Sequence, residues 1–261
     1  MYGFGYTGII ASMKKLPSGG GNGALTTAWI AATSETDTTI ISALNTLETD
    51  LTTYGLTAKI KALYPMVGAT ATKHKFNFMD ARDLDVAFRL QFFGGWTHSS
   101  TGAKPNGGSY ANTFLIPSAV LSLNSAHLSF YSRTPSSAAY CLMGAYTAPT
   151  RTGIYASSLF GINANSWVSA ISTTGRTYFI GSRTSSTNML SRCYSITQTD
   201  VQASSILPTN SIEINRLGGY SGDYSPNETA FVTIGDGLTS GEMTNLQIAV
   251  QAFQTTLSRQ V

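Results

Sequence analysis

The sequence predicts a mainly β protein, a sandwich or jelly roll, with a helical segment before the β-region and a helix after it. Between residues 74 and 234, short β-type runs alternate with glycine-containing turns, which is the pattern of a sandwich or jelly roll. Apolar residues at helical spacing occur on either side of this region. Hydrophobic residues make up 42% of the 261 residues, so one large domain with a sizeable core is expected.

The polar surface carries unusually little charge. Only 11% of the residues are charged, less than half the usual share of about 25%. This composition fits a secreted β-protein, a virion protein or a chain buried in an assembly better than a cytosolic enzyme. The net charge of +3, without a long basic run, argues against a nucleic-acid groove. No apolar stretch reaches the roughly 18 residues of a membrane helix, so we expect no membrane insertion.

Residues 1–23 are predicted to be an anchoring peptide followed by a glycine-rich linker. Residues 18–23 have the composition of a flexible linker. The preceding segment contains more large apolar groups than disordered tails carry. A disordered tail is the alternative interpretation. The residues that we expect to contact a partner protein are Tyr2, Phe4, Tyr6, Ile9 and Ile10.

Residues 24–68 are predicted to form a helical neck. Ser34 is the expected N-cap, and the main helix ends at Gly55. A second short helix is expected at about 57–63, before Pro65. The apolar stripe predicts a face that packs against the β-domain, with a short trimeric bundle as the alternative. The stripe consists of Ile40, Leu44, Leu47, Leu51 and Tyr54.

Residues 69–261 are predicted to form the jelly-roll domain. Its strand-like runs are 75–78, 86–93, 121–133, 140–143, 177–182, 191–196 and 211–215. Expected turns lie at 94–95, 105–108, 174–175 and 218–219. Cys141 and Cys193 are far apart in sequence, and we expect them to be reduced and buried rather than disulfide-bonded.

The closing helix is predicted at 239–258. A β-type run that includes Phe231 and Ile234 ends in a Gly-Asp-Gly turn. Thr239 and Glu242 then form the pattern of a capping box. Spacings of four, three and four give the helix one apolar face. That face is made of Leu246, Val250, Phe253 and Leu257.

This closing segment, with Leu238-Thr239-Ser240-Gly241-Glu242-Met243 at the helix start, resembles the end of concanavalin A-like (laminin G-like) jelly rolls. Other stretches resemble structural proteins of tailed phages. They are Tyr64-Pro65-Met66-Val67-Gly68, Gly95-Trp96-Thr97-His98-Ser99-Ser100, Phe130-Tyr131-Ser132-Arg133-Thr134, Gly181-Ser182-Arg183-Thr184 and Phe253-Gln254-Thr255-Thr256-Leu257. The resemblance spans about residues 34–261.

The resemblance implies a structural protein on the surface of a bacteriophage particle, such as a head fibre, tail fibre or similar appendage. Its sandwich would be displayed outward, and its N-terminal segment would attach to other virion proteins. The usual form of such appendages implies a homo-oligomer, with a trimer favoured. The alternative is a lectin-like carbohydrate-binding module that attaches to host surface glycans, and the two functions are compatible.

A glycoside hydrolase is the less favoured function. The related jelly-roll hydrolases resemble one another in a Glu-x-Asp-x-x-Glu strand, because cleavage needs two carboxylates in one cleft. The nearest approach, Glu35-Thr36-Asp37, lacks the last Glu and falls in the helical segment. The three histidines lack metal-ligand spacing, and no phosphate loop is present. We therefore expect no catalytic residues, no metal and no cofactor.

The candidate glycan-binding residues come from two polar, aromatic segments that we expect to be loops, 96–112 and 218–227. Sugars bind to exposed aromatic faces together with amide, hydroxyl or carboxylate groups. The second segment also offers Asp223 for Ca²⁺, although one acid rarely supplies six to eight oxygen ligands. The competing interpretation is that the aromatic residues are buried. The candidates are Trp96, Tyr110, Asn112, Tyr220, Asp223 and Tyr224.

Overall fold

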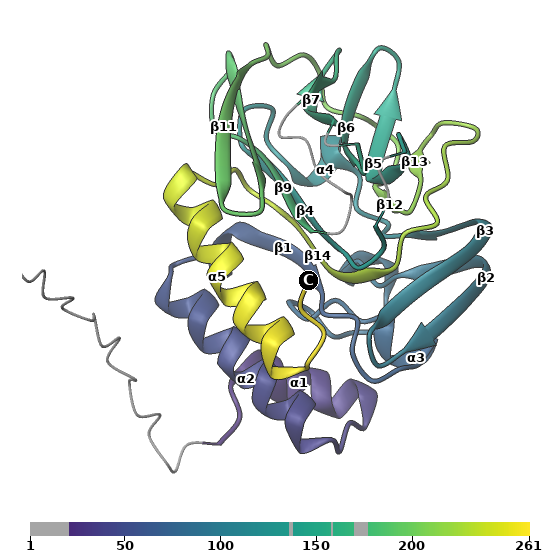
Figure 1. Ribbon diagram of the computed structural model, residues 1–261, viewed down its shortest axis with the longest axis vertical. Coiled ribbons are helices and arrows are strands. Elements are labelled where there is room, and N and C mark those ends of the chain that lie inside the picture. Colours follow the sequence, from purple (N-terminus) through teal and green to yellow (C-terminus); the bar gives the residue numbers. More distant parts are fainter. Residues whose placement is uncertain (1–20, 136–137, 158, 170–176) are drawn as a thin grey trace, which may run out of the picture.

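The computed structural model describes residues 21–135, 138–157, 159–169 and 177–261. It is a mainly β jelly-roll sandwich with a helical layer on one side (Figure 1), which confirms the predicted fold class. The helices are α1 (Ala24–Thr33), α2 (Thr38–Thr53), α3 (Ala71–His74), α4 (Pro117–Val120) and α5 (Ser240–Thr256). Short 3₁₀ turns lie at Thr57–Lys59 and Asp85–Ala87. None of the helices in these ranges is long and apolar enough to cross a membrane.

The strands of the described residues form one hydrogen-bonded sheet that curls into two facing parts. The strands are β1 (Ile60–Tyr64), β2 (Gln91–Ser99), β3 (Gly102–Asn112), β4 (Ala126–Ser132), β5 (Cys141–Thr147), β6 (Thr150–Tyr155), β7 (Leu159–Ala164), β8 (Val168–Ser169), β9 (Tyr178–Arg183), β10 (Asn188–Cys193), β11 (Ile196–Val201), β12 (Glu213–Ile214), β13 (Leu217–Gly218) and β14 (Thr229–Gly235). Their order is β11-β10-β9-β4-β14-β3-β12-β5-β6-β7-β8, with β1 beside β14, β2 beside β3 and β13 beside β5.

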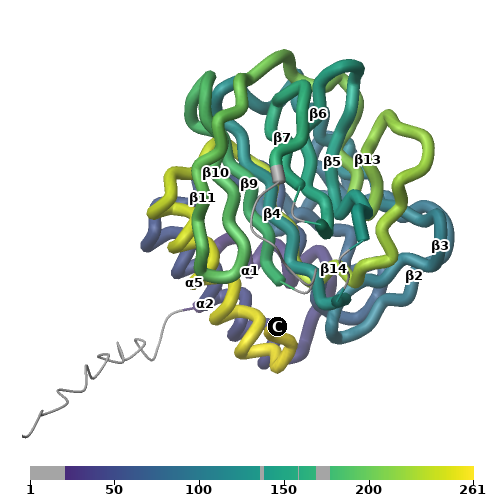
Figure 2. Tube along the Cα trace, turned by 45° about the horizontal axis from the view of Figure 1, so that its top comes forward, coloured from purple at the N-terminus to yellow at the C-terminus, as the bar shows by residue number. Residues whose placement is uncertain are grey.

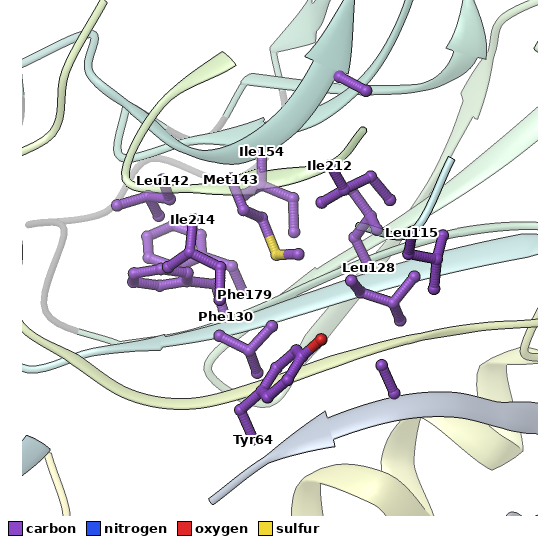
Figure 3. Close-up of a cluster of buried hydrophobic side chains, with 14 of the residues drawn as sticks. Tyr64, Leu115, Leu128, Phe130, Leu142, Met143, Ile154, Phe179, Ile212 and Ile214 are labelled. Atoms are coloured by element: carbon purple, nitrogen blue, oxygen red, sulfur yellow. The ribbon is translucent and has the colours of Figure 1, made fainter. Parts of the chain in front are cut away.

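The main core lies between the two facing parts of the sheet. Phe130 of β4 and Phe179 of β9 come from one part, and Met143 of β5 and Ile154 of β6 come from the other. Figure 3 shows these side chains, with Tyr64 of β1, pointing into the same space. The alternation of strand side chains therefore leaves every second residue of β5, β6 and β7 on the outer face of the sandwich.

A second core joins the helical layer to the other face of β1, β4 and β14. Leu44 and Leu47 of α2 and Phe253 of α5 are buried together with Phe231 of β14 and Tyr131 of β4. The apolar stripe of α2 thus packs against the β-domain, as the sequence predicted. In both views α1, α2 and α5 lie on the opposite side of the molecule from β5, β6 and β7 (Figure 1, Figure 2).

Two details of the helical segment differ from the prediction. Ser34 ends α1 with a left-handed φ of 52°, and Asp37 caps α2 by accepting from the backbone N–H groups of Thr39 and Ile40. The short helix expected at 57–63 is a 3₁₀ turn followed by β1, which pairs antiparallel with β14. Ladder hydrogen bonds to β14 therefore outweigh the weak local helical preference.

The β2–β3 region also differs from the prediction. The segment 96–112, expected to be a loop, belongs to a long hairpin whose register shifts between Phe93 and Gly95. Gly94 (φ 78°) and Gly108 (φ 64°) adopt left-handed conformations at this irregularity, which glycine tolerates without steric cost. The predicted turns at 94–95 and 105–108 are therefore irregular positions inside strands. The run at 75–78, expected to be a strand, contributes only an isolated bridge from Asn77 to Asp80. The turn expected at 174–175 lies outside the described residues.

The closing helix and the cysteines agree with the prediction. The Thr239 hydroxyl accepts from the Glu242 N–H at 3.3 Å, and the Thr239 N–H donates to the Glu242 carboxylate at 2.8 Å. Both halves of the capping box are therefore present. Cys141 and Cys193 are both buried, and no disulfide joins them.

Candidate functional site

The outer face of β5, β6 and β7 carries a row of glycines at neighbouring positions. Gly144 of β5 pairs with Gly153 of β6, which in turn pairs with Gly161 of β7. The row leaves bare backbone in the middle of three strands, and the indole of Trp167 lies on it. A Cβ atom on Gly153 would lie 3.1 Å from Trp167 Cη2, and one on Gly161 would lie 3.1 Å from Trp167 Cε3. Glycine at these two positions therefore makes room for the indole ring.

Further aromatic rings surround this indole. Tyr155 contacts Trp167 edge-to-face, with ring centroids 4.5 Å apart. Tyr146 contacts Tyr220 in the same manner at 5.8 Å. Edge-to-face contacts hold the rings at fixed angles and contribute about 0.5–1.5 kcal/mol each beyond area burial. These aromatic contacts give the site a fixed shape.

Two charged side chains complete the site. The Tyr155 hydroxyl donates to the carboxylate of Asp223. Burial, together with the nearby Cys141 and the Asp223 hydrogen bond, raises the pKa of Tyr155 well above its usual range. The tyrosine hydroxyl is therefore a donor at neutral pH. On the other side, the Arg151 guanidinium lies 5.3 Å from the centre of the Trp167 ring and 5.5 Å from that of Tyr146.

Together these groups line an open pocket of about 280 Å³, here called the aromatic pocket. This volume is close to the lower end of the range of small-molecule sites, roughly 300–1,000 Å³. Tyr220 forms its rim with 48% of its surface exposed. The lining residues are Tyr146, Arg151, Tyr155, Trp167, Leu217, Tyr220 and Asp223.

The structure brings two of the six predicted glycan-binding residues, Tyr220 and Asp223, into the aromatic pocket. Tyr110 and Tyr224 lie together elsewhere, with ring centroids 6.3 Å apart. The Arg216 guanidinium covers the Tyr110 ring at 3.6 Å and is paired with Glu213. This arrangement covers one face of Tyr110 with a side chain of the protein itself.

The other two candidates have structural contacts. Trp96 packs against the main core, and its indole N–H donates to the Phe93 carbonyl at 3.1 Å. The side-chain oxygen of Asn112 accepts from the Phe114 N–H at 2.7 Å. Neither residue lines the aromatic pocket. The candidate anchoring residues Tyr2, Phe4, Tyr6, Ile9 and Ile10 lie outside the described residues.

Sequence reasoning missed Tyr146, Arg151, Tyr155 and Trp167. One signal was available: in the run Thr150-Arg151-Thr152-Gly153-Ile154-Tyr155, every second residue is arginine, glycine or tyrosine. Such alternation puts an arginine and a tyrosine on one face of a strand, beside a position without a side chain. The contribution of Trp167 depends on which strands pair, and no short motif contains that information.

Two other features are less suited to binding. A hollow of about 390 Å³ lies between the start of α2 and the end of α5. Its buried Glu35 is already paired with Lys73 at 3.1 Å and accepts from the Thr36 and Asp37 N–H groups. Elsewhere, His74 and His98 are joined through their Nδ1 atoms at 2.9 Å. Within the described ranges, no three His, Cys, Asp or Glu side chains gather in a way that could hold a metal ion.

Comparison with known proteins gives structural likeness only. No known family matches the sequence, and neither does any curated protein. Domain 4 of AbnA, a GH43 extracellular arabinanase from Geobacillus stearothermophilus solved with arabinotriose, aligns with a TM-score of 0.50 and 13% identity. That alignment covers 72% of this chain and 98% of the arabinanase domain. At this identity the likeness shows the β-sandwich fold alone.

Two further solved structures align more weakly. The binding domain of botulinum neurotoxin serotype G has a TM-score of 0.45 and 12% identity, over 72% of this chain and 50% of that one. A mutant of Trypanosoma rangeli sialidase has a TM-score of 0.42 and 8% identity, over 83% of this chain and 39% of that one. The alignments thus span half or less of these two proteins.

Proposed function

We propose that this protein is a glycan-binding β-sandwich module and that the aromatic pocket is its binding site. The observation that carries the proposal is the open pocket of four aromatic rings with one arginine and one aspartate. Ligand pockets combine apolar and aromatic walls with a few polar groups that fix orientation. A sugar matches such a pocket, because its ring faces present apolar C–H groups and its edges present polar hydroxyls.

Each pocket residue has a role in this proposal. The indole of Trp167, supported by the glycine row, offers a flat surface for a sugar ring. Asp223 accepts hydrogen bonds from sugar hydroxyls, and the hydrogen bond from Tyr155 holds its carboxylate in place. Tyr220 closes over the ligand from the rim. Rigid aromatic groups of this kind lose little conformational entropy on binding.

The structural comparison supports the proposal at the level of fold. The arabinanase domain was solved with arabinotriose, so a sandwich of this type is compatible with sugar binding. We propose binding without hydrolysis, because glycoside hydrolysis needs two carboxylates flanking the bond. Among the residues that line the pocket, Asp223 is the one carboxylate.

A glycan array tests the proposal. We expect the purified protein to bind a subset of printed oligosaccharides, and Trp167→Ala to weaken that binding about tenfold or more, as loss of a central aromatic contact does. Tyr220→Ala should weaken it less, because Tyr220 lies at the rim. Tyr194→Ala, which removes a half-exposed tyrosine from the β10–β11 turn, is the matched control.

Two results would reject glycan binding at this site. One is the absence of binding across a broad array. The other is binding that Trp167→Ala leaves unchanged while Trp96→Ala or Tyr110→Ala abolishes it. Circular dichroism of each variant confirms that the fold is intact.

We also propose, separately, that the module is displayed on a phage particle as an oligomeric appendage. This proposal rests on the sequence resemblance, on the low charge and on the apolar residues of segment 1–17. Cryo-electron microscopy of intact particles tests it. The segment should be ordered against another virion protein, and its absence from every virion interface would reject anchoring by this route.

A further inference from the structure

Arg151 is the feature of the aromatic pocket that a neutral sugar does not explain. Its Nη2 donates to the Pro149 carbonyl at 3.1 Å. Its Nε is shielded from solvent and has no hydrogen-bond partner among the described residues. A shielded N–H without a partner is energetically unfavourable. Because Nε is shielded, a ligand in the pocket would meet the terminal nitrogens of this guanidinium, which belongs to a side chain lining the open pocket.

The charge of Arg151 is also uncompensated within the described part of the chain. Arg82, Arg89, Arg133 and Arg216 each have a carboxylate partner there. Arg183, Arg192 and Arg259 have no carboxylate partner in the same ranges but each donate to at least two oxygen acceptors of the protein. Arg151 has no carboxylate partner among the described residues, and its hydrogen bond to Pro149 joins it to a residue only two positions away. The rings of Tyr146 and Trp167 attract the cation, but cation–π contacts do not neutralise its charge.

The acid in the same pocket does not act as a counter-ion. Asp223 accepts from the Tyr155 hydroxyl, and no ion pair joins it to Arg151. The pocket thus has a positive end at Arg151, between Tyr146 and Trp167, and a negative end at Asp223, beside Tyr155. A ligand that matches this polarity carries an anionic group at one end and hydroxyl donors at the other.

We propose that the aromatic pocket selects acidic glycans, in which a carboxylate or sulfate group on the bound sugar pairs with Arg151. The inference rests on the proposed glycan binding and specifies its ligand class. The planar guanidinium offers several N–H donors in a fixed fork, which suits the oxygens of such groups. The C–H face of the same sugar then packs on Trp167, and its hydroxyls donate to Asp223.

Matched pairs of oligosaccharides test the inference by isothermal titration calorimetry. The pairs are trigalacturonate with its carboxyl-reduced neutral form, sialyllactose with lactose, and a sulfated lactose with lactose. In at least one pair the acidic member should bind about tenfold more tightly or better, since hydrogen bonds between two charged groups are stronger than those between neutral groups. Which pair responds identifies the anionic group.

Two variants of Arg151 distinguish the effect of its positive charge from that of its planar guanidinium group. Arg151→Gln should remove the preference for the acidic member, so that the two members of the responding pair bind with similar affinity. Arg151→Lys should retain part of the preference, because it keeps the charge and loses the fork. Arg82→Gln, which removes an exposed guanidinium paired with Asp80, is the control. Added salt should lower the affinity for the acidic oligosaccharide and leave the affinity for the neutral one nearly constant.

The outcomes distinguish the inference from the function on which it rests. Equal affinity within every pair, with loss of binding on Trp167→Ala, would overturn the acidic selectivity and leave glycan binding in place. Equal loss of both members on Arg151→Gln, with the fold intact, would also overturn it. Failure of all the oligosaccharides to bind would reject both.

Discussion

At the scale of single residues, His127 links the stability of the fold to pH. It is buried on β4, where its Nδ1 donates to the Asp236 carbonyl at 2.6 Å and its Nε2 contacts the Thr233 hydroxyl at 3.1 Å. Burial lowers the pKa of His127 to about 4. Because the folded pKa lies below the unfolded value of about 6.5, the unfolded state binds the proton first. The stabilisation is therefore complete above about pH 6.5 and is lost as the pH falls toward 4.

We predict that His127→Gln flattens the pH profile of stability in this window. Between pH 7 and about pH 4.5, the wild type should lose on the order of 2–3 kcal/mol of unfolding free energy through this group, and the variant should not. Urea unfolding at both pH values measures the difference. Carboxylates titrate in both proteins, so the comparison isolates the histidine. An identical acid-induced loss in the two proteins would contradict the prediction.

Only some of the pocket residues could be predicted from the sequence. Tyr220 and Asp223 could be predicted because they lie close together in the sequence, in one polar segment that contains aromatic and acidic residues. Trp167 became a pocket residue only through Gly153 and Gly161, which pair across β6 and β7. Pairing register is a long-range property, so the glycine support of the indole could not be derived from the sequence.

At the scale of elements, Arg259 fastens the end of α5 to the β-sandwich. Its side chain is only 1% exposed, and its guanidinium donates to the carbonyls of Pro65, Met66 and Ala230 at 2.6, 2.7 and 3.0 Å. These carbonyls follow β1 and belong to β14. Burial lowers the pKa of Arg259 to about 9, so the group is still charged at neutral pH.

We predict that Arg259→Met lowers the unfolding free energy by about 3 kcal/mol or more, because it leaves several buried carbonyls without a donor. Arg259→Lys should cost less, since an ammonium group can still donate to some of them. Chemical unfolding measures both effects. Arg82→Met, at an exposed site, should change stability by about 0.5 kcal/mol or less. A comparably small effect of Arg259→Met would refute the fastening role.

The elements that were predicted correctly are those with a local signal. The α5 helix has a capping box and an apolar face in adjacent turns, and both are present. The segment that forms β1 has no such local signal. It is a strand because it pairs with β14, about 170 residues away in the sequence. The β2–β3 hairpin was missed for a similar reason: its glycines interrupt the strand pattern, and cross-strand pairing restores it.

At the scale of the whole molecule, the helical layer and the sandwich share strands. On β14, Phe231 faces the helices, and Val232 and Ile234 face the inter-sheet core. On the neighbouring β4, Tyr131 faces the helices and Phe130 faces the inter-sheet core. A substitution that destabilises one core should therefore also destabilise the other, because the two cores share the backbone of these strands. The helices found at 24–53 are in this sense a third layer of the fold, continuous with the domain predicted at 69–261.

This shared framework predicts that the two cores unfold together. Leu47→Ala, in the middle of the helical core, should destabilise the protein by about 2–5 kcal/mol. The loss should be the same whether fluorescence follows Trp29, buried in the helical layer, or Trp167, in the aromatic pocket. Variants that keep one of these tryptophans, with the others replaced by phenylalanine, supply the two probes. Coincident transitions before and after the substitution indicate one cooperative unit. If Leu47→Ala moved the Trp29 transition alone, the helices would be a separable neck, and the inter-sheet core would stand without them.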